Sequence, residues 1–201
     1  MTTVTLSSLP RESRWVTEPV AWCVDADDSL TITAGGRTDW FVDPAGAAAI
    51  DNAPRTLFTP PDRTFLLSAK VRVAFAATFD AGVLQVYARD DLWAKLCFEY
   101  SPQRQPMVVS VVTRDVSDDC NGPMIDGPEV YLRMARTARA FVFHYSRDGV
   151  SWHLVRHFGL GTVDSVQVGV AVQSPTGQGC TAIFSEVTYR QGAPVDIRGG
   201  E

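Results

Sequence analysis

Polar and aromatic side chains alternate with apolar ones along residues 82–100, in a pattern that could bind or process a polar molecule. The stretch has the period of two strands, in which successive side chains point to opposite faces of a sheet. The apolar positions are Leu84, Val86, Leu96 and Phe98, and the alternate positions are Gln85, Tyr87, Trp93, Lys95 and Glu99. The sequence therefore predicts one row that faces a core and one row that can contact a ligand.

The polar row combines an aromatic platform with charged hydrogen-bonding groups, a combination that suits a sugar or another polar ring with an apolar face. We expect Arg133 to join the row from a neighbouring strand, in one concave groove. The predicted ligand-binding residues are thus Gln85, Tyr87, Trp93, Lys95, Glu99 and Arg133. The alternative is structural: Lys95, Glu99 and Arg133 would form ion pairs across exposed strands, and Trp93 would cap the sheet edge.

A catalytic version of this row would use Glu99 and Lys95 as acid–base groups with pKa values shifted by proximity and burial. Glycosidases need two carboxylates across the scissile bond. Positions 95 and 97 hold lysine and cysteine, so the second carboxylate would come from another element, with Asp39 the first candidate and Glu186 the second. Since only one carboxylate is in place, we expect binding without turnover, and Glu99, Lys95 and Asp39 remain the candidate catalytic residues.

An acidic stretch is the best candidate for metal binding. Residues 115–128 are predicted to form a long loop with several possible oxygen ligands for Ca²⁺. They are Asp115, Asp118, Asp119, Asn121 and Asp126. The spacing is not that of an EF-hand, and acidic loops are more often merely solvated, so we expect no bound metal.

Other motifs of cofactor or nucleophile chemistry are missing from the sequence. It contains no P-loop, no GxGxxG and no GxSxG. His153 and His157 could share a strand face with His144 across a hairpin, but residues four apart on a strand are too distant to hold one zinc ion. We therefore expect no cofactor.

Composition bounds the remaining possibilities. A chain of 201 residues with 45% hydrophobic residues can bury a sizeable core, and we expect one domain over residues 1–191 followed by a flexible tail over 192–201. A net charge of -5 argues against a nucleic-acid partner. Without a long apolar run or a leader pattern, we expect no membrane partner and a cytoplasmic location. The four scattered cysteines are expected to be reduced.

Strand signals dominate the chain, and no helical period persists over the length of a helix. The expected strands cover residues 30–33, 66–75, 82–88, 93–100, 107–114, 130–136, 140–146, 152–158, 166–174 and 181–190. Residues 45–50 could form a single helical turn or a loop. Many short antiparallel strands at this spacing predict an all-β jelly-roll sandwich of two curved sheets.

A sharp hairpin is predicted at Ser146–Trp152, SRDGVSW. Asp148-Gly149 supplies the positive-φ turn, and the aspartate can accept hydrogen bonds from the turn backbone. We expect this motif to be purely structural.

An ordered series of motifs covers roughly residues 15–189: TDW at 38–40, GVL at 82–84, WAK at 93–95, VTR at 112–114, YLRMAR at 131–136 and SRDGVSW at 146–152. Together they resemble an uncharacterised family of bacteria and fungi that includes the fungal regulation-of-enolase protein. The resemblance implies a concanavalin-A-like sandwich, the architecture also found in lectins and glucanases. The chain departs from the family pattern after the VTR strand, where Asp119-Cys120 replaces a Trp-Ser pair, and again after Lys95, where a glycine is usual.

Three classes of function follow. In the first, which we favour, the chain is a non-catalytic module that binds a small polar or carbohydrate-like ligand in the groove. In the second, the same face contacts a protein partner, as the resemblance to the regulation-of-enolase protein implies. In the third, the chain is an enzyme that processes a carbohydrate or metabolite with Glu99 and Lys95.

Overall fold

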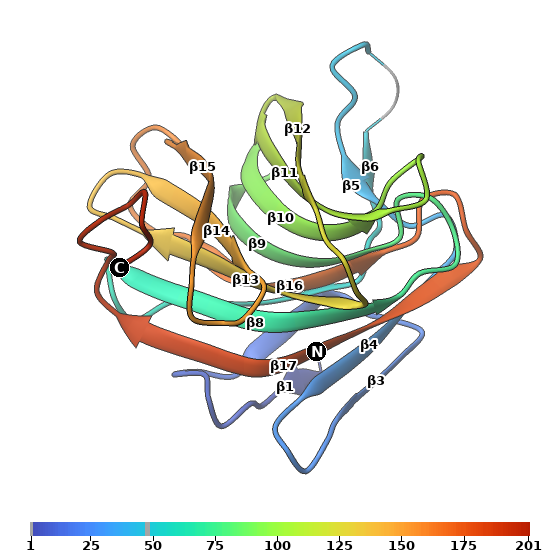
Figure 1. Cartoon of the computed structure of the whole chain (residues 1–201), viewed down its shortest axis with the longest axis horizontal. Coiled ribbons are helices and arrows are strands. Elements are labelled where there is room, and N and C mark those ends of the chain that lie inside the picture. The colour runs from blue at the N-terminus through green and yellow to red at the C-terminus, as the bar shows by residue number, and fades with distance from the viewer. Residues whose placement is uncertain (1, 47–48) are drawn as a thin grey trace.

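The computed structural model describes residues 2–46 and 49–201 of the chain. Every regular element among these residues is a β-strand, and the strands form two large antiparallel sheets stacked as a sandwich (Figure 1). The predicted fold, an all-β jelly-roll sandwich of the concanavalin-A type, is confirmed. Of the possible helical turn at residues 45–50, positions 47 and 48 lie outside the described residues. No helix in the described ranges is long and apolar enough to cross a membrane.

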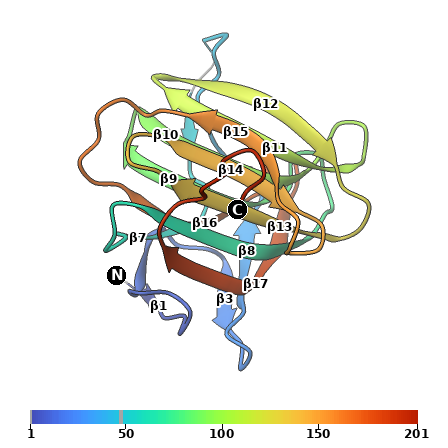
Figure 2. The ribbon, with the colours of Figure 1, turned by 60° about the vertical axis from the view of Figure 1, so that its left-hand side comes forward.

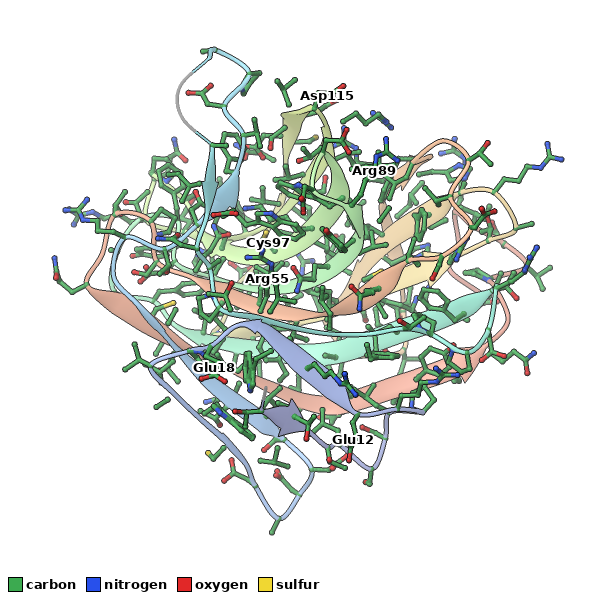
Figure 3. The ribbon with its side chains drawn as sticks, turned by 180° about the vertical axis from the view of Figure 1, so that it is seen from behind. Glu12, Glu18, Arg55, Arg89, Cys97 and Asp115 are labelled. Atoms are coloured by element: carbon green, nitrogen blue, oxygen red, sulfur yellow. The ribbon has the colours of Figure 1, made fainter. Side chains whose placement is uncertain are left out.

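Sheet A contains eight strands. In spatial order they are β1 (Thr3–Val4), β2 (Ser13–Thr17), β7 (Arg55–Phe58), β16 (Gln167–Gln173), β9 (Ala81–Arg89), β10 (Leu92–Tyr100), β11 (Pro106–Arg114) and β12 (Val116–Met124). β9, β10 and β11 are long consecutive strands that curve together. Figure 3 labels Arg89, at the end of β9, and Asp115, in the turn between β11 and β12.

Sheet B contains seven strands. In spatial order they are β15 (His153–Phe158), β14 (Phe141–Ser146), β13 (Glu129–Arg136), β8 (Phe65–Ala74), β17 (Gly179–Gln191), β4 (Leu30–Gly35) and β3 (Ala21–Val24). A third, two-stranded sheet pairs β5 (Trp40–Phe41) with β6 (Ile50–Asp51), without hydrogen-bonded pairing to either large sheet.

The core lies between the two sheets and confirms the predicted parity of residues 82–100. Leu84, Leu96 and Phe98 are fully buried in the main apolar cluster, where sheet B contributes residues such as Val71 and Phe184. Burying each large apolar side chain contributes about 1.5–3 kcal/mol relative to exposure, so this row alone is a substantial part of the driving force. The opposite parity must then lie on the outer face of sheet A.

The predicted loop over residues 115–128 is wrong for most of its length, because β12 occupies 116–124 and pairs with β11. β12 is the edge strand of sheet A, and six of its nine side chains are exposed. Edge strands that face solvent keep polar side chains, and a run of aspartates there resembles a loop in composition. Asp115, with a positive φ of 65°, makes the turn into the strand.

The predicted hairpin between β14 and β15 is present. Asp148 accepts hydrogen bonds from the backbone nitrogens of Val150 and Ser151, and Gly149 has a φ of 76°. These bonds hold the pKa of Asp148 well below its ordinary value.

The C-terminal segment, residues 192–201, lies against the outer face of sheet B (Figure 2). Arg133 donates to the carbonyl of Gly200 at 2.7 Å, and His144 Nε2 lies 2.8 Å from the carbonyl oxygen of Ile197. The predicted flexibility of this segment stays a prediction, but its backbone carbonyls are partners of two side chains of sheet B.

Candidate functional site

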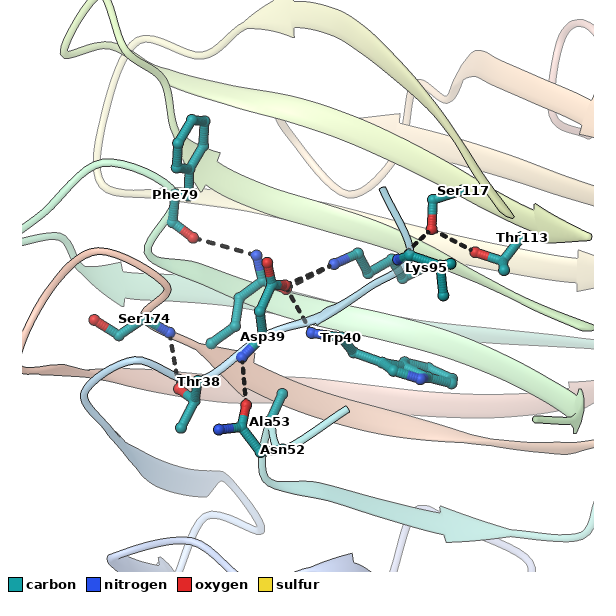
Figure 4. Close-up of polar contacts among 12 residues, drawn as sticks. Thr38, Asp39, Trp40, Asn52, Ala53, Phe79, Lys95, Thr113, Ser117 and Ser174 are labelled. Carbon is teal, nitrogen blue, oxygen red and sulfur yellow. Dashed lines mark hydrogen bonds and ion pairs between the residues drawn. The ribbon is translucent and has the colours of Figure 1, made fainter. Parts of the chain in front are cut away.

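Residues 38–42 cross the outer face of sheet A (Figure 4), and Asp39 and Phe41 of this segment form one wall of a groove. Thr38 and Ser174 exchange backbone hydrogen bonds of 3.3 and 3.1 Å at one end of the crossing. At the other end, Val42 donates to Ser117 Oγ at 3.0 Å and accepts from the Ser117 backbone nitrogen at 2.9 Å. The segment is thus attached to β16 on one side and to β12 on the other.

The ring of Trp40 fixes the middle of this segment. It stacks on Trp93 of β10 with 3.9 Å between ring centroids, and the Arg55 guanidinium lies 4.9 Å from the centroid of the Trp40 ring. Both indoles are buried, and they pack with Ala53 and Val111 in a small apolar cluster on the outer face. Aromatic stacking of this kind adds about 0.5–1.5 kcal/mol to the area buried.

Lys95 forms the floor of the groove and is only 3% exposed. Its ammonium donates to Gln173 Oε1 at 2.9 Å and to Asp39 Oδ1 at 3.3 Å. Burial alone would lower the pKa of Lys95. The nearby negative charges, of which Asp39 is the strongest, outweigh this effect, and the net pKa lies above the ordinary value. Lys95 is therefore a buried, permanently charged donor at neutral pH.

Glu99 lies on the same strand face as Lys95 and is 9% exposed. Its carboxyl group has no hydrogen-bond partner among the described residues, although it lines the groove. Burial, opposed in part by Lys95, raises the pKa of Glu99 to about 8. At neutral pH most of this carboxyl is protonated, so it can donate one hydrogen bond and accept others.

Two more carboxyl groups face the groove. Two hydrogen bonds hold Asp39 in place. Its backbone nitrogen donates to Asn52 Oδ1 at 2.9 Å, and its carboxylate accepts from the backbone nitrogen of Trp40 at 2.7 Å. Asp119 reaches the groove from β12. Partial burial raises the pKa of Asp119, although the charge of Lys95 acts in the opposite direction.

The apolar walls are Phe41, Phe79 and Val111, which with Asp39, Lys95, Glu99, Asp119 and Gln173 enclose a cavity of about 200 Å³. Phe79 is 37% exposed and has a φ of 70°, unusual for a bulky residue. Its turn is held by the buried Asp80, whose carboxylate accepts from the backbone nitrogens of Ala76 and Ala77 and from Ser174 Oγ. The fold therefore stabilises a strained turn that presents an aromatic ring to the groove.

The structure brings together only part of the predicted ligand-binding set. Lys95, Glu99 and the catalytic candidate Asp39 line the groove. Gln85 and Trp93 share their face but are fully buried: Trp93 packs against Trp40 and Ala53, and Gln85 donates to the carbonyl of Val170 at 3.2 Å. Tyr87 does not line the groove: it packs against the Trp40 cluster, and its hydroxyl donates to Asp90 at 2.7 Å.

Arg133 is not in the groove, and the expectation that it reaches the polar row from a neighbouring strand is wrong. β13 belongs to sheet B, where Arg133 pairs in register with Ser68 and His144 on the outer face. Its guanidinium carbon lies 4.0 Å from the centroid of the Trp152 ring. Glu186, the reserve carboxylate, also lies on sheet B, where it bonds Tyr131.

The candidate calcium ligands do not converge. Asp118 and Asp119 are consecutive on a strand and so point to opposite faces. Asp118 pairs with Arg156 at 2.8 Å, whereas Asp119 faces the groove. Among the residues that the structure describes, no three carboxylate, histidine or cysteine side chains gather as metal ligands.

Sequence reasoning missed Phe41, Phe79, Val111 and Gln173. Phe79 and Gln173 come from a turn and from the end of β16, and only the three-dimensional fold places them beside Lys95. One signal was available: Gln173 is a polar residue that ends the apolar strand QVGVAVQ. A polar residue at such a position has to find a buried partner, and Lys95 is that partner.

The fold and groove define a β-sandwich protein of the concanavalin-A type with a small polar cavity on the outer face of one sheet. Residues 15–192 match the family described as "Protein of unknown function (DUF1349)", and the chain belongs to that family. No curated protein matches the chain.

Solved structures match over most of the chain. A functionally unknown protein from Saccharomyces cerevisiae matches with a TM-score of 0.82 and 22% identity, over 90% of this chain and 96% of that one. The GH43 protein BlXynB from Bacillus licheniformis, as its K247S mutant, matches with a TM-score of 0.69 and 15% identity, over 89% of this chain but only 36% of that one. An alginate lyase from Klebsiella pneumoniae matches with a TM-score of 0.56 and 12% identity, over 86% and 84%. At these identities the likeness concerns the fold.

Proposed function

We propose that the chain is a binding module that holds a small, polar, carbohydrate-like ligand in the groove above Lys95, without turning it over. The observation that carries the proposal is that the carboxyl of Glu99, without a hydrogen-bond partner in the described part of the chain, lines the same cavity as the buried ammonium of Lys95. The comparisons leave the ligand open.

The energetics of the floor support a polar ligand. Burying a carboxyl or an ammonium group without complete hydrogen bonding costs free energy. Lys95 has two acceptors, Asp39 and Gln173, whereas Glu99 has no partner in the described part of the chain. Ligand hydroxyl groups can donate to and accept from both side chains, and would complete the hydrogen bonding of the floor.

The walls set the shape of the ligand. Phe41 and Phe79 present apolar ring surfaces beside the polar floor, which suits a ring with polar edges and an apolar face. The cavity of about 200 Å³ is below the range of roughly 300–1,000 Å³ typical of drug-sized ligands. It therefore fits a single sugar-sized ring or the end of a longer chain.

The choice of carbohydrate also draws on the fold. Two of the similar structures are described as a GH43 protein and an alginate lyase. This chain spans about a third of the GH43 protein. The likeness makes sugars and uronic acids the first compounds to test.

A thermal-shift and calorimetric screen tests this proposal. Monosaccharides, short oligosaccharides, uronic acids and small polar metabolites are titrated into the parent chain, and a ligand is expected to raise Tm. Phe79→Ala, which removes an exposed ring, is expected to weaken that ligand about three- to tenfold, the equivalent of one aromatic contact. Glu99→Gln and Lys95→Ala test the floor.

Val150→Ala is the matched control, because Val150 is an apolar side chain that is 80% exposed on the hairpin between β14 and β15. It should bind as the parent does. If no compound raises the Tm of the parent, or if the groove variants bind as tightly as Val150→Ala, the proposed site is wrong.

A second candidate function is a carbohydrate-processing enzyme, and one observation favours it. Glu99, Asp39 and Asp119 line the same cavity, and the pKa of Glu99 is raised to about 8, which suits a general acid. Product analysis by mass spectrometry after long incubation with each ligand distinguishes the two functions. Products that disappear in both Glu99→Gln and Asp39→Asn would establish turnover, and an unchanged ligand would leave the binding module as the function.

A further inference from the structure

Three arginines from two segments, Arg63 before β8 and Arg136 and Arg139 around the end of β13, meet at one end of sheet B. Phe65, Arg136, Phe141 and Phe158 occupy one row across neighbouring strands, because Phe65 pairs with Arg136, Arg136 with Phe141 and Phe141 with Phe158. Arg63 precedes this row, Arg139 lies in the turn after it, and residues 159–164 continue from its far side. Arg63, Arg136, Arg139, Phe141 and residues 161–164 line a cavity of about 570 Å³.

The cavity carries an excess of positive charge. Arg63, Arg136 and Arg139 line it together with a single acid, Asp164, so two positive charges remain in excess. None of the three guanidinium groups forms an ion pair with an acidic side chain among the described residues. The whole chain has a net charge of -5, so the concentration of positive charge here runs against the overall balance.

Arg136 is held in place rather than free in solvent. Its Nη2 donates to the carbonyl of Val163 at 2.9 Å, and its guanidinium carbon lies 5.7 Å from the centroid of the Phe141 ring. Partial burial, with the like charge of Arg63, lowers the pKa of Arg136. An arginine still keeps its proton at neutral pH, so the repulsion between the two groups persists until an anion offsets it.

We infer that this arginine cavity is a second ligand site, which binds the dianionic phosphate of a small phosphomonoester. Two excess positive charges match the charge of about -1.5 to -2 that such a group carries at pH 7. Guanidinium groups bind phosphate oxygens in pairs and remain charged throughout. The volume exceeds what phosphate alone would fill and lies within the range of roughly 300–1,000 Å³ for small-molecule sites, which leaves room for an organic group beside Phe141 and Val163.

The site is independent of the groove on sheet A, since the two cavities share no lining residue. Failure of the sugar screen would therefore not bear on phosphate binding, and failure of phosphate binding would not bear on the groove.

Calorimetry at low ionic strength tests the inference with inorganic phosphate, phenyl phosphate, sulfate and benzoate as probes. Phenyl phosphate is expected to bind at least fivefold more tightly than benzoate, which carries a single charge. Arg63→Gln and Arg139→Gln, both at exposed positions, should each weaken phenyl phosphate at least fivefold. Arg89→Gln is the matched control, because Arg89 is an exposed arginine on β9 of sheet A that pairs with Asp91.

Acidification provides a second readout. The second pKa of a phosphomonoester is about 6, so phenyl phosphate should bind about tenfold more weakly at pH 5 than at pH 7. Sulfate keeps its charge and should bind equally at pH 5 and pH 7. The inference is overturned if phenyl phosphate binds no better than benzoate. It is equally overturned if the Arg63→Gln/Arg139→Gln double variant, shown to be folded by circular dichroism, binds phenyl phosphate as the parent does.

Discussion

The indole rings of Trp40 and Trp93 stack with 3.9 Å between their centroids and 17° between their planes. They are 53 positions apart in the sequence, and the contact attaches the segment that crosses the outer face of sheet A to β10. Trp93 is fully buried as a result, so an aromatic residue on the ligand-facing parity supports the wall of the groove instead of contacting a ligand.

Trp40→Ala should therefore detach the crossing segment while sparing the sandwich. Replacing a buried tryptophan by alanine commonly costs about 3–5 kcal/mol, and the loss here should lie in the lower part of that range because the segment can collapse onto sheet A. Urea unfolding measures the loss. Trp93 should at the same time become accessible to quenching by acrylamide, and unchanged quenching would contradict the role given to the stack.

Glu99→Gln should change how stability depends on pH. The pKa of Glu99 is about 8 in the folded chain against 4.5 as its ordinary value. Between these two values the folded state holds a proton that the unfolded state has released, so the folding stability of the parent falls as pH rises through this window. A glutamine has no proton to lose and should not show that fall.

The measurement is the difference in unfolding free energy between Glu99→Gln and the parent, followed by urea titration from pH 5 to 9. The variant should gain on the order of a few kcal/mol relative to the parent across the window, mostly below pH 8. A difference that stays flat with pH would mean that Glu99 is solvated and ionised, contrary to its burial.

Gly82→Val tests the packing between the sheets at the start of β9. A Cβ atom on Gly82 would lie 2.6 Å from Val71 Cγ1 and 3.1 Å from the Ala182 Cβ, so the core has no room for one. Overpacking of this kind costs about 1–3 kcal/mol. Gly127→Val provides a control for loss of glycine, because nothing lies within 4 Å of a Cβ there, although its φ of 120° adds strain. Equal stability of Gly82→Val and the parent would exclude the tight contact.

The architecture could be predicted from the sequence because apolar and polar residues alternate along strands such as β9 and β10, and this alternation is a local feature. The alternation of Leu84, Val86, Leu96 and Phe98 with polar residues fixes which face enters the core, whatever the partner strand. The edge strand β12 escaped prediction, because its polar residues satisfy an exposed edge and carry no apolar period.

Of the site, only the residues that belong to an alternating strand could be predicted. Lys95 and Glu99 share the outer face of β10, and the alternation locates both. Arg133 is also a charged residue within an alternating strand, so the local pattern does not distinguish it from Lys95. Its sheet depends on which strands pair over long range, and the sequence does not contain that information locally. The position of Phe79 in the groove depends on the conformation of a turn, and the burial of Trp93 depends on the segment that covers it. The alternation of side chains along a strand indicates neither.

Lys95→Met tests the charge network of the groove floor. Methionine keeps the volume and removes the cation that now offsets Asp39 and Glu99. Without it the pKa of Glu99 should rise further, and breaking the buried Lys95–Asp39 pair should cost about 3–5 kcal/mol near neutral pH. In the Lys95→Met/Glu99→Gln double variant the change in unfolding free energy should differ from the sum of the two single changes, by a coupling energy of about 0.5–3 kcal/mol. Chemical denaturation of the four proteins at pH 7 and at pH 9 completes the cycle. Because an ionised Glu99 repels Asp39 and attracts Lys95, the coupling should be larger at pH 9, and a coupling that vanishes at both pH values would show that Lys95 and Glu99 do not interact.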